Sequence, residues 1–239
     1  MAFYRNVKFW VESENQKKQI DFFFNHMINA GFSGRDQKTV WDHILELEKE
    51  GIPGPKTTPV FFSLTCNNLL FNDIIQVGGH KTSGEVEFVM CIQNDKTYIG
   101  IGSDHTDRAL EQFSMPNAKE ICPNIMSDVL WDYDEIKNHW DEIEISSYTR
   151  EQINSKDILY QKGKLSNILH PNELKEIVKK QLIQKDLTET VIFSGTIPIV
   201  TSHTIYGEYF ACKLFDPILN RSLNCNYEIQ KINNIFIED

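Results

Sequence analysis

Two short apolar runs joined by a tight turn constrain the fold more than any other feature of the chain. Residues 85–92 (EVEFVMCI) and residues 97–101 (TYIGI) are of strand length, and an Asn-Asp pair between them is typical of a turn. Successive side chains of a strand point to opposite faces, so Glu85 and Glu87 share one face and the apolar residues beside them share the other. The pattern predicts a β-hairpin that carries two carboxylates on one face.

Two carboxylates on one face of an apolar strand have two explanations. They repel each other unless a proton, a base or a cation intervenes, and Asp104, after the next apolar run, could supply a third carboxylate. From the alternation alone, a solvated face of an antiparallel sheet is the commoner explanation for Glu85 and Glu87, because clustered acids mark functional sites only with some probability. A cation site is the alternative.

The rest of the chain is also rich in strand-length runs. We expect strands in the second half of residues 19–32 and at residues 3–12, 59–64, 73–77, 142–148, 158–161, 190–194, 209–215 and 223–232. Helical signals are fewer. They predict a helix over 37–50 with Asp36 as its N-cap, a short helix over 109–113 and an amphipathic helix over 172–184. We therefore expect a β-rich α+β fold in a single domain over residues 1–239.

Two segments have weaker periodicity. Residues 114–126, which include Lys119, are expected to form a loop followed by a strand. Residues 128–141 (DVLWDYDEIKNHWD) are acidic and aromatic, and we expect them at the surface, where they could contribute to an interface with a second copy of the chain.

Charge and cysteine content exclude several classes of protein. The chain has 34 acidic and 24 basic residues and a formal charge of −10, whereas nucleic-acid binding needs a clustered basic face. Five cysteines without a C-x-x-C pair fit reduced thiols better than disulfides or a zinc site. The N-terminus has no signal-peptide core, and no apolar run approaches the roughly 20 residues of a membrane span. We expect a cytoplasmic protein that binds neither nucleic acid nor membrane.

The remaining chemical signal is the set of carboxylates. A trio of carboxylate oxygens without thiolate or imidazole suits Mg²⁺, Mn²⁺ or Ca²⁺ rather than zinc. Such a cation can chelate a 2-oxo acid and stabilise the enolate formed when the neighbouring C–C bond breaks. His43 and Glu46 are neighbours on one helix face, where the carboxylate would orient the imidazole as a base toward water. A surface His–Glu pair is the plain alternative.

Residues 31–200 resemble the catalytic region of the fumarylacetoacetate hydrolase superfamily. GEVEF (84–88) matches its E-x-E-L metal strand, and GSDHTDR (102–108) is similar to its N-D-x-[ST]-A-R-D turn. AKEICP (118–123) resembles its A-K-S-x-x-x-x-x-P segment, and TVIFSGT (190–196) its D-I-I-x-T-G-T strand. GRDQKTVWDHILEL (34–47) resembles its G-R-N-Y-x-x-H-x-x-E segment with a longer spacer. Residues 1–30 are not covered by the resemblance.

The resemblance implies a role for each matched residue. The implied metal ligands are Glu85, Glu87 and Asp104, with Mg²⁺ or Mn²⁺ as the cofactor and Ca²⁺ as a further candidate. The implied catalytic residues are His43, Glu46 and Lys119, with Lys119 neutralising a substrate carboxylate or enolate. The implied substrate-binding residues are Arg108, Glu111, Gly195 and Thr196. Arg108 could equally be a structural partner of Glu111 or Asp107, and His105 could either support Asp104 or pack in the turn.

The sequence also departs from the family pattern. The family's aspartate after the motif arginine is Ala109, its following glutamine is Glu111, and a lysine expected at the end of the 59–64 strand is Leu64. The SerGlyThr segment continues as IlePro. These changes leave the metal trio and the dyad intact but alter the pocket, so the substrate does not carry over. GSDHTDR, with Asp107 in place of alanine, resembles an uncharacterised bacterial branch of the superfamily.

Taken with the residues, the resemblance predicts a mixed β-sheet roll or sandwich and a homodimer. The expected activity is a divalent-metal-dependent hydrolase or decarboxylase that cleaves a C–C bond in a 2-oxo or β-dicarbonyl acid. Two alternatives stay open at the same site, a tautomerase or isomerase and a non-catalytic protein that binds a small acid.

Overall fold

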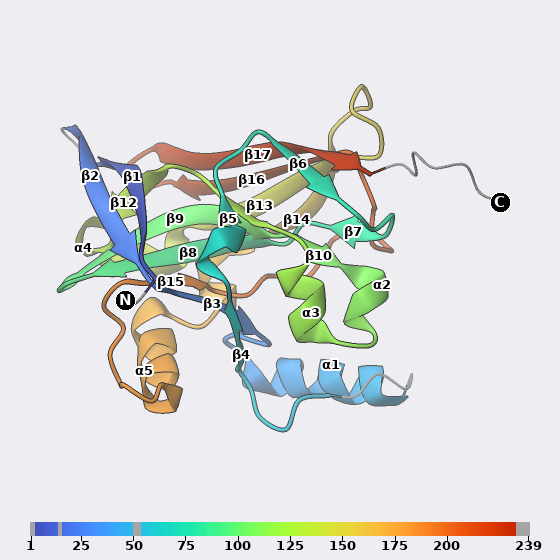
Figure 1. Cartoon of the computed structure of the whole chain (residues 1–239), viewed down its shortest axis with the longest axis horizontal. Coiled ribbons are helices and arrows are strands. Elements are labelled where there is room, and N and C mark those ends of the chain that lie inside the picture. The colour runs from blue at the N-terminus through green and yellow to red at the C-terminus, as the bar shows by residue number, and fades with distance from the viewer. Residues whose placement is uncertain (1–2, 14–15, 50–53, 233–239) are drawn as a thin grey trace.

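The computed structural model describes residues 3–13, 16–49 and 54–232, without the side chains of His43 and residues 46–49. Within that part the chain forms a large mixed sheet, a smaller sheet and a few helices (Figure 1). The ten strands of the larger sheet are, in spatial order, β2 (Lys17–Phe24), β1 (Arg5–Glu12), β12 (Val129–Asp132), β9 (Lys96–Asp104), β8 (Val86–Gln93), β15 (Thr190–Phe193), β3 (His26–Gly31) and β4 (Val60–Leu64), with β11 (Asn124–Met126) beside β9 and β5 (Leu69–Leu70) beside β11.

The smaller sheet lies along the upper side of Figure 1. Its five strands are, in spatial order, β14 (Ile158–Lys164), β13 (Glu144–Arg150), β16 (Tyr209–Asp216), β17 (Arg221–Lys231) and β6 (Ile74–Val77). A separate two-stranded sheet pairs β7 (Thr82–Ser83) with β10 (Thr106–Asp107). The predicted β-rich α+β class, with curled mixed sheets, is confirmed.

The helices α1, α2, α3 and α5 lie along the lower side of the same view. The α-helices are α1 (Gln37–Lys49), α2 (Arg108–Glu111), α3 (Met115–Glu120), α4 (Tyr133–Ile136) and α5 (Pro171–Gln181), and the 3₁₀ turns are η1 (Cys66–Asn68), η2 (Lys137–Glu142) and η3 (Leu165–Asn167). Asp36 caps α1 as predicted, because its Oδ1 accepts hydrogen bonds from the backbone N–H groups of Lys38 and Thr39. In the part of the chain that the structure covers, no helix is long and apolar enough to cross a membrane.

Strand β8 is buried on both of its faces. Val86, Phe88 and Met90 belong to the larger apolar cluster, together with side chains of the smaller sheet such as Phe210. Val89 and Cys91, on the other face, pack in a second cluster with phenylalanines of β1 and β2. Glu85 and Glu87, which precede them on that face, therefore lie close to a core. The alternating pattern alone would instead suggest a face open to solvent.

Two expectations about irregular segments are wrong. Residues 115–120 form helix α3 instead of a loop, with a proline in the first turn where its missing N–H costs nothing. The aromatic side chains of residues 128–141 are buried, with Trp131 at 0% and Trp140 at 2% exposure, and the Trp140 ring stands edge-on to Phe88 at 5.0 Å. The charged residues of β12 and α4 point outward, whereas the aromatic ones point into the core. The segment therefore offers no aromatic surface for an interface.

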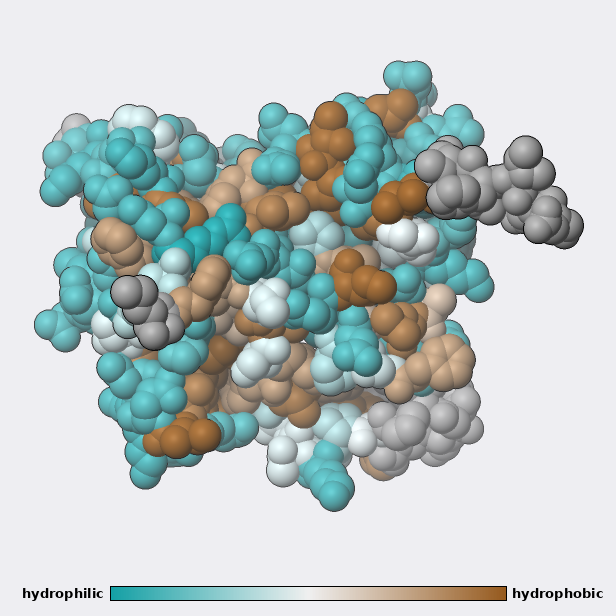
Figure 2. All heavy atoms as spheres, in the orientation of Figure 1, coloured by the Kyte–Doolittle hydropathy of each residue, from teal (hydrophilic) through white to brown (hydrophobic). Residues whose placement is uncertain are grey.

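On the face shown in Figure 2, hydrophobic residues are scattered among hydrophilic ones. The most exposed large apolar side chains of the described residues include Ile183 at 99% and Phe113 at 86%. Isolated apolar side chains of this kind are ordinary at protein surfaces.

Candidate metal centre

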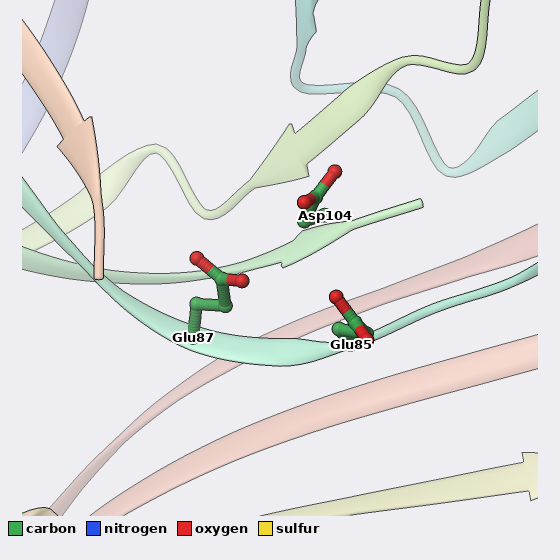
Figure 3. Close-up of side chains that lie close together, drawn as sticks. All are labelled: Glu85, Glu87 and Asp104. Carbon is green, nitrogen blue, oxygen red and sulfur yellow. The ribbon is translucent and has the colours of Figure 1, made fainter. Parts of the chain in front are cut away.

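Three carboxylates meet at one end of the β8–β9 hairpin. Glu87 on β8 and Glu85 just before it project toward Asp104 at the end of β9 (Figure 3). The hairpin register pairs Val86 with Ser103, and the backbone N–H of Asp104 donates to the carbonyl of Glu85 at 3.1 Å. One oxygen from each carboxylate can be chosen so that all three lie within 4.8 Å of one another. The structure thus brings together the three residues that the sequence suggested as metal ligands.

Each of the three carboxylates has one oxygen fixed by a donor. The backbone N–H of Gly195 donates to Glu87 Oε2 at 2.8 Å, and Lys119 Nζ donates to Asp104 Oδ2. Arg108 Nη2 forms an ion pair with Glu85 Oε1 at 3.0 Å. These donors come from three separate parts of the chain, so the carboxylates are oriented without any bound ion.

The second oxygen of each carboxylate is almost unused. Glu87 Oε1 is buried and has no hydrogen-bond partner, and Asp104 Oδ1 has a long contact of 3.5 Å with Thr106 Oγ1. Glu85 Oε2 lies 3.7 Å from Lys119 Nζ, beyond hydrogen-bond length. Opposite ligands are about 4.2 Å apart around Mg²⁺ and about 4.6–5.2 Å apart around Ca²⁺. An oxygen trio within 4.8 Å therefore fits a hard divalent cation after small side-chain adjustments.

Burial and charge perturb the carboxylates in opposite directions. Burial, reinforced by the negative charges of Asp104 and Glu85, raises the pKa of Glu87 well above its ordinary value. Burial also raises the pKa of Asp104, in spite of its contact with Lys119. Burial alone would raise the pKa of Glu85, but the charges of Arg108 and Lys119 outweigh it and hold this pKa below its ordinary value. Without a cation, Glu87 is thus the carboxylate that most readily holds a proton.

The charges of the cluster do not balance. Arg108 Nη1 also bonds to Glu111 Oε2 at 3.0 Å, which adds a fourth carboxylate to the trio beside the two cations Arg108 and Lys119. The net charge is −2 when all six groups are ionised, which one divalent cation would neutralise. Despite its burial, the carboxylates around Lys119 raise its pKa, so the ammonium stays charged at neutral pH.

Gly195 can be replaced by no other residue without strain. Its φ is +82°, and a Cβ atom added there would lie 2.1 Å from Ser33 Oγ and 2.9 Å from the carbonyl oxygen of Ala30. The backbone passes close to Ser33 and Ala30 at this point, and in this conformation the Gly195 N–H points at Glu87. The neighbouring Thr196 uses its hydroxyl proton on the carbonyl of Val86 at 2.8 Å, so this hydroxyl has no proton left for a substrate carboxylate.

Gln161 of β14 is a residue of the site that the sequence did not indicate. Its Oε1 accepts from the Val86 N–H at 3.0 Å and from Ser147 Oγ at 2.9 Å. Its Nε2 donates to Thr196 Oγ1 at 2.7 Å and to the carbonyl of Ile197 at 2.6 Å. Gln161 thus ties the β8 backbone, between the two glutamates, to the segment that follows β15. Because it is 75 residues from Val86 in sequence, no local pattern could have revealed this contact.

Tyr227 of β17 is a second such residue. Its hydroxyl lies 2.8 Å from Ser103 Oγ and 2.9 Å from His105 Nδ1, and Ser103 Oγ accepts from the Glu85 N–H at 3.2 Å. Burial, aided by the charge of Arg108, lowers the pKa of His105 to about 3, so the imidazole is neutral. His105 therefore supports the turn around Asp104 from the side of the smaller sheet. It does not line the cavity described next.

A cavity of about 1090 Å³ opens over the carboxylates. It is lined by Glu85, Glu87, Arg108, Glu111, Lys119, Gly195 and Thr196, all of which the sequence had indicated. Helix α1 contributes Thr39, Val40 and Ile44 to the same wall. His43 and Glu46 belong to α1, but their side chains lie outside the described part of the chain. Asp104 is fully buried next to the cavity.

Comparison with known proteins gives a family and a fold. Residues 30–227 match the model of the family described as "Protein of unknown function (DUF2848)". No curated protein was found to match the chain.

Several solved structures share the fold at low sequence identity. 2-Keto-3-deoxy-D-arabinonate dehydratase, complexed with magnesium and 2,5-dioxopentanoate, is 14% identical with a TM-score of 0.62, over 87% of this chain and 74% of that one. 5-Carboxymethyl-2-hydroxymuconate delta-isomerase from Mycobacterium smegmatis is 14% identical with a TM-score of 0.59, over 88% and 80%. Fumarylacetoacetate hydrolase from Exiguobacterium antarcticum is 13% identical with a TM-score of 0.53, over 92% and 83%. The chain has the fold of these proteins.

Proposed function

This chain belongs to the family described as "Protein of unknown function (DUF2848)", and we propose that it is an enzyme that uses a divalent cation to act on a 2-oxo or β-dicarbonyl acid. The proposed cation ligands are Glu85, Glu87 and Asp104, and the proposed ion is Mg²⁺, with Mn²⁺ as a further candidate. The proposed reaction is cleavage of a C–C bond, by hydrolysis or decarboxylation.

One observation carries this proposal. The three carboxylates beside a large cavity each have one oxygen fixed by a donor and one nearly free, within a cluster of net charge −2. Three all-oxygen ligands of this kind match the preference of Mg²⁺ and leave further coordination positions for substrate or water. One structure of this fold carries magnesium and a dioxo acid, which supports the choice of ion and of substrate class.

The chain's own residues would share the work around the ion. A bound divalent cation supplies Lewis-acid polarisation of the substrate oxygens and stabilises negative charge that develops in the reaction. Lys119, buried and charged, would hold Asp104 in place and lower the energy of an anionic substrate beside it. The Gly195 N–H would keep Glu87 aimed at the ion.

Helix α1 would supply the base. Position 43 is one helical turn beyond Thr39, which lines the cavity, and this helical spacing supports the choice of His43. His43, oriented by Glu46, would then deprotonate a water molecule for hydrolysis. An isomerase also has this fold, and a reaction without water activation is the second candidate. Replacing His43 with Ala separates the two, because hydrolysis would be lost and isomerisation would survive.

Metal binding is the first test. Isothermal titration of Mg²⁺ into EDTA-treated protein should give one site per chain, and Glu87→Gln and Asp104→Asn should weaken it at least about tenfold, since each removes a charged ligand. Glu142→Gln is a matched control, because it removes a surface carboxylate that pairs with Lys164 at 3.0 Å away from the cavity. Equal Mg²⁺ affinity in all four proteins would refute the proposed site.

Turnover is the second test. A panel of 2-oxo and β-dicarbonyl acids should yield a substrate whose conversion stops on metal removal and returns with Mg²⁺. Tight binding of these acids without any turnover would favour the non-catalytic alternative. The homodimer, the single domain and the cytoplasmic location stay predictions, the first of which light scattering would test.

A further inference from the structure

The charges that line the cavity are unevenly distributed. Among the described lining residues, Arg108 and Lys119 are the cations, and five residues with carboxylates also line the cavity, Asp36, Asp42, Glu85, Glu87 and Glu111. A second carboxylate on a substrate, away from the metal, would need a cation or an N–H donor that is not already engaged. The state of the two cations therefore affects which acids the cavity accepts.

Both cations are already engaged by carboxylates. Arg108 donates from Nε to Ser83 Oγ at 2.8 Å, pairs through Nη2 with Glu85 at 3.0 Å and bonds through Nη1 to Glu111 at 3.0 Å. Lys119 is held by Asp104. Glu85 and Asp104 belong to the carboxylate trio, whereas Glu111 lies outside it and its only described ionic partner is Arg108. Glu111 thus binds the Nη1 group of Arg108, which does not contact the carboxylate trio.

We propose that Glu111 is the specificity-determining residue of the cavity, which selects 2-oxo acids that have one carboxylate and an uncharged tail and discriminates against dicarboxylic acids. This inference rests on the proposed function, because it assumes that the 2-oxo acid end is held at the metal. With a divalent cation bound, the cluster of four carboxylates and two cations is neutral. One substrate carboxylate brings it to −1, and a second would bring it to −2 in a partly buried site.

Part of the remaining wall suits such a tail, although Gln112 and Asn167 also line the cavity. Met115, Ile197, Pro198 and Ile199 line it, and Phe32 adds an aromatic wall. Apolar surface of this kind stabilises an uncharged chain by burial and offers nothing to a carboxylate. Removing the charge of Glu111 would leave Arg108 with one carboxylate partner and shift the metal-loaded cluster to +1.

The experiment compares two acids of similar length by isothermal titration in saturating Mg²⁺. 2-Oxohexanoate ends in an uncharged tail, and 2-oxoglutarate ends in a carboxylate. Wild-type protein should bind 2-oxohexanoate at least about tenfold more tightly, the effect of roughly one charge-assisted hydrogen bond. Glu111→Gln should reduce or reverse this preference by about tenfold, mainly through tighter binding of 2-oxoglutarate.

Two further variants control the comparison. Glu111→Asp keeps the charge and should keep most of the wild-type preference, and Glu142→Gln, which removes a surface ion pair, should not change it. Thermal melts would show that each variant is folded, and if Glu111→Gln is not, the preference of Glu111→Asp and equal binding by wild type remain as tests.

The outcomes separate the two levels of the proposal. Equal binding of the two acids by wild type, or an unchanged preference in folded Glu111→Gln, would overturn this inference and leave the metal site standing. Binding of neither acid in Mg²⁺ would overturn this inference, whereas the proposed function would fall only if the Mg²⁺ titration or the whole panel of acids also failed.

Discussion

Replacing Gln161 with Leu should disturb the candidate site from outside the carboxylate trio. The side chain is 1% exposed and makes four hydrogen bonds, three of them to groups of Val86, Thr196 and Ile197 beside the site and one to Ser147. Leucine has a similar volume, so little of the expected loss would come from a cavity. The loss would come instead from polar groups left buried without their partner.

The magnitude follows from these bonds. A buried donor or acceptor that loses its partner costs about 1–3 kcal/mol, and Thr196 Oγ1 would keep its bond to Val86. We expect a total loss of about 3–5 kcal/mol in the free energy of unfolding. For a chain of this size, about 2–4 °C of melting temperature corresponds to 1 kcal/mol, so Tm should fall by about 6–20 °C.

Circular dichroism melts in EDTA would measure this loss without any contribution from metal. Gln93→Leu is the matched control, because Gln93 accepts one bond from the Phe23 N–H at 3.0 Å near the surface, and water can replace it. Its Tm should fall by less than about 4 °C. If the two variants melted at the same temperature, the role assigned to the Gln161 amide would be wrong.

Three further predictions concern single groups of the site. Gly195→Ala should lower the unfolding free energy by about 2–4 kcal/mol in a chemical denaturation, whereas Gly78→Ala, with open space around its Cβ position, should change it by less than 1 kcal/mol. Burial raises the pKa of Glu87, and below that pKa Mg²⁺ must displace a proton. Mg²⁺ affinity should therefore fall as the pH drops through that pKa and level off above it, with proton release seen on the acid side in buffers of different ionisation enthalpy. A flat profile would contradict this. Tyr227→Phe removes both hydrogen bonds of the buried hydroxyl and should cost about 1–3 kcal/mol, read as a lower urea midpoint with an unchanged m-value.

Much of the fold could be predicted because strand-length runs and turn residues are local signals. The β8–β9 hairpin and the Asp36 cap of α1 follow from a few adjacent residues each. Helix α3 could not be predicted in this way, because six residues around a proline carry too little periodicity. The segment 128–141 was placed at the surface because its acidic residues dominate its composition, although its tryptophans are core residues.

The residues of the site also fall into those that local sequence predicts and those that it does not. Glu85, Glu87 and Asp104 are marked by position in a hairpin, and the structure brings them together. The groups that orient them come from elements distant in sequence, and their contacts depend on how the two sheets pack. Gln161 is one of these, and Tyr227 is another. No spacing rule links such pairs, so the supporting residues could be identified only from the structure.

The donors around the carboxylates explain how a cluster with excess negative charge is compatible with a folded chain. The Gly195 N–H, Lys119 and Arg108 each hold one oxygen, and the raised pKa of Glu87 lets a proton offset part of the repulsion when no cation is present. A cation would take the place of that proton, and each carboxylate keeps one oxygen without a close donor that could bind it. Glu111 can be used to test ligand choice in this cluster. It is the one carboxylate of the cluster outside the trio, so its effect on ligand choice can be measured separately from metal binding.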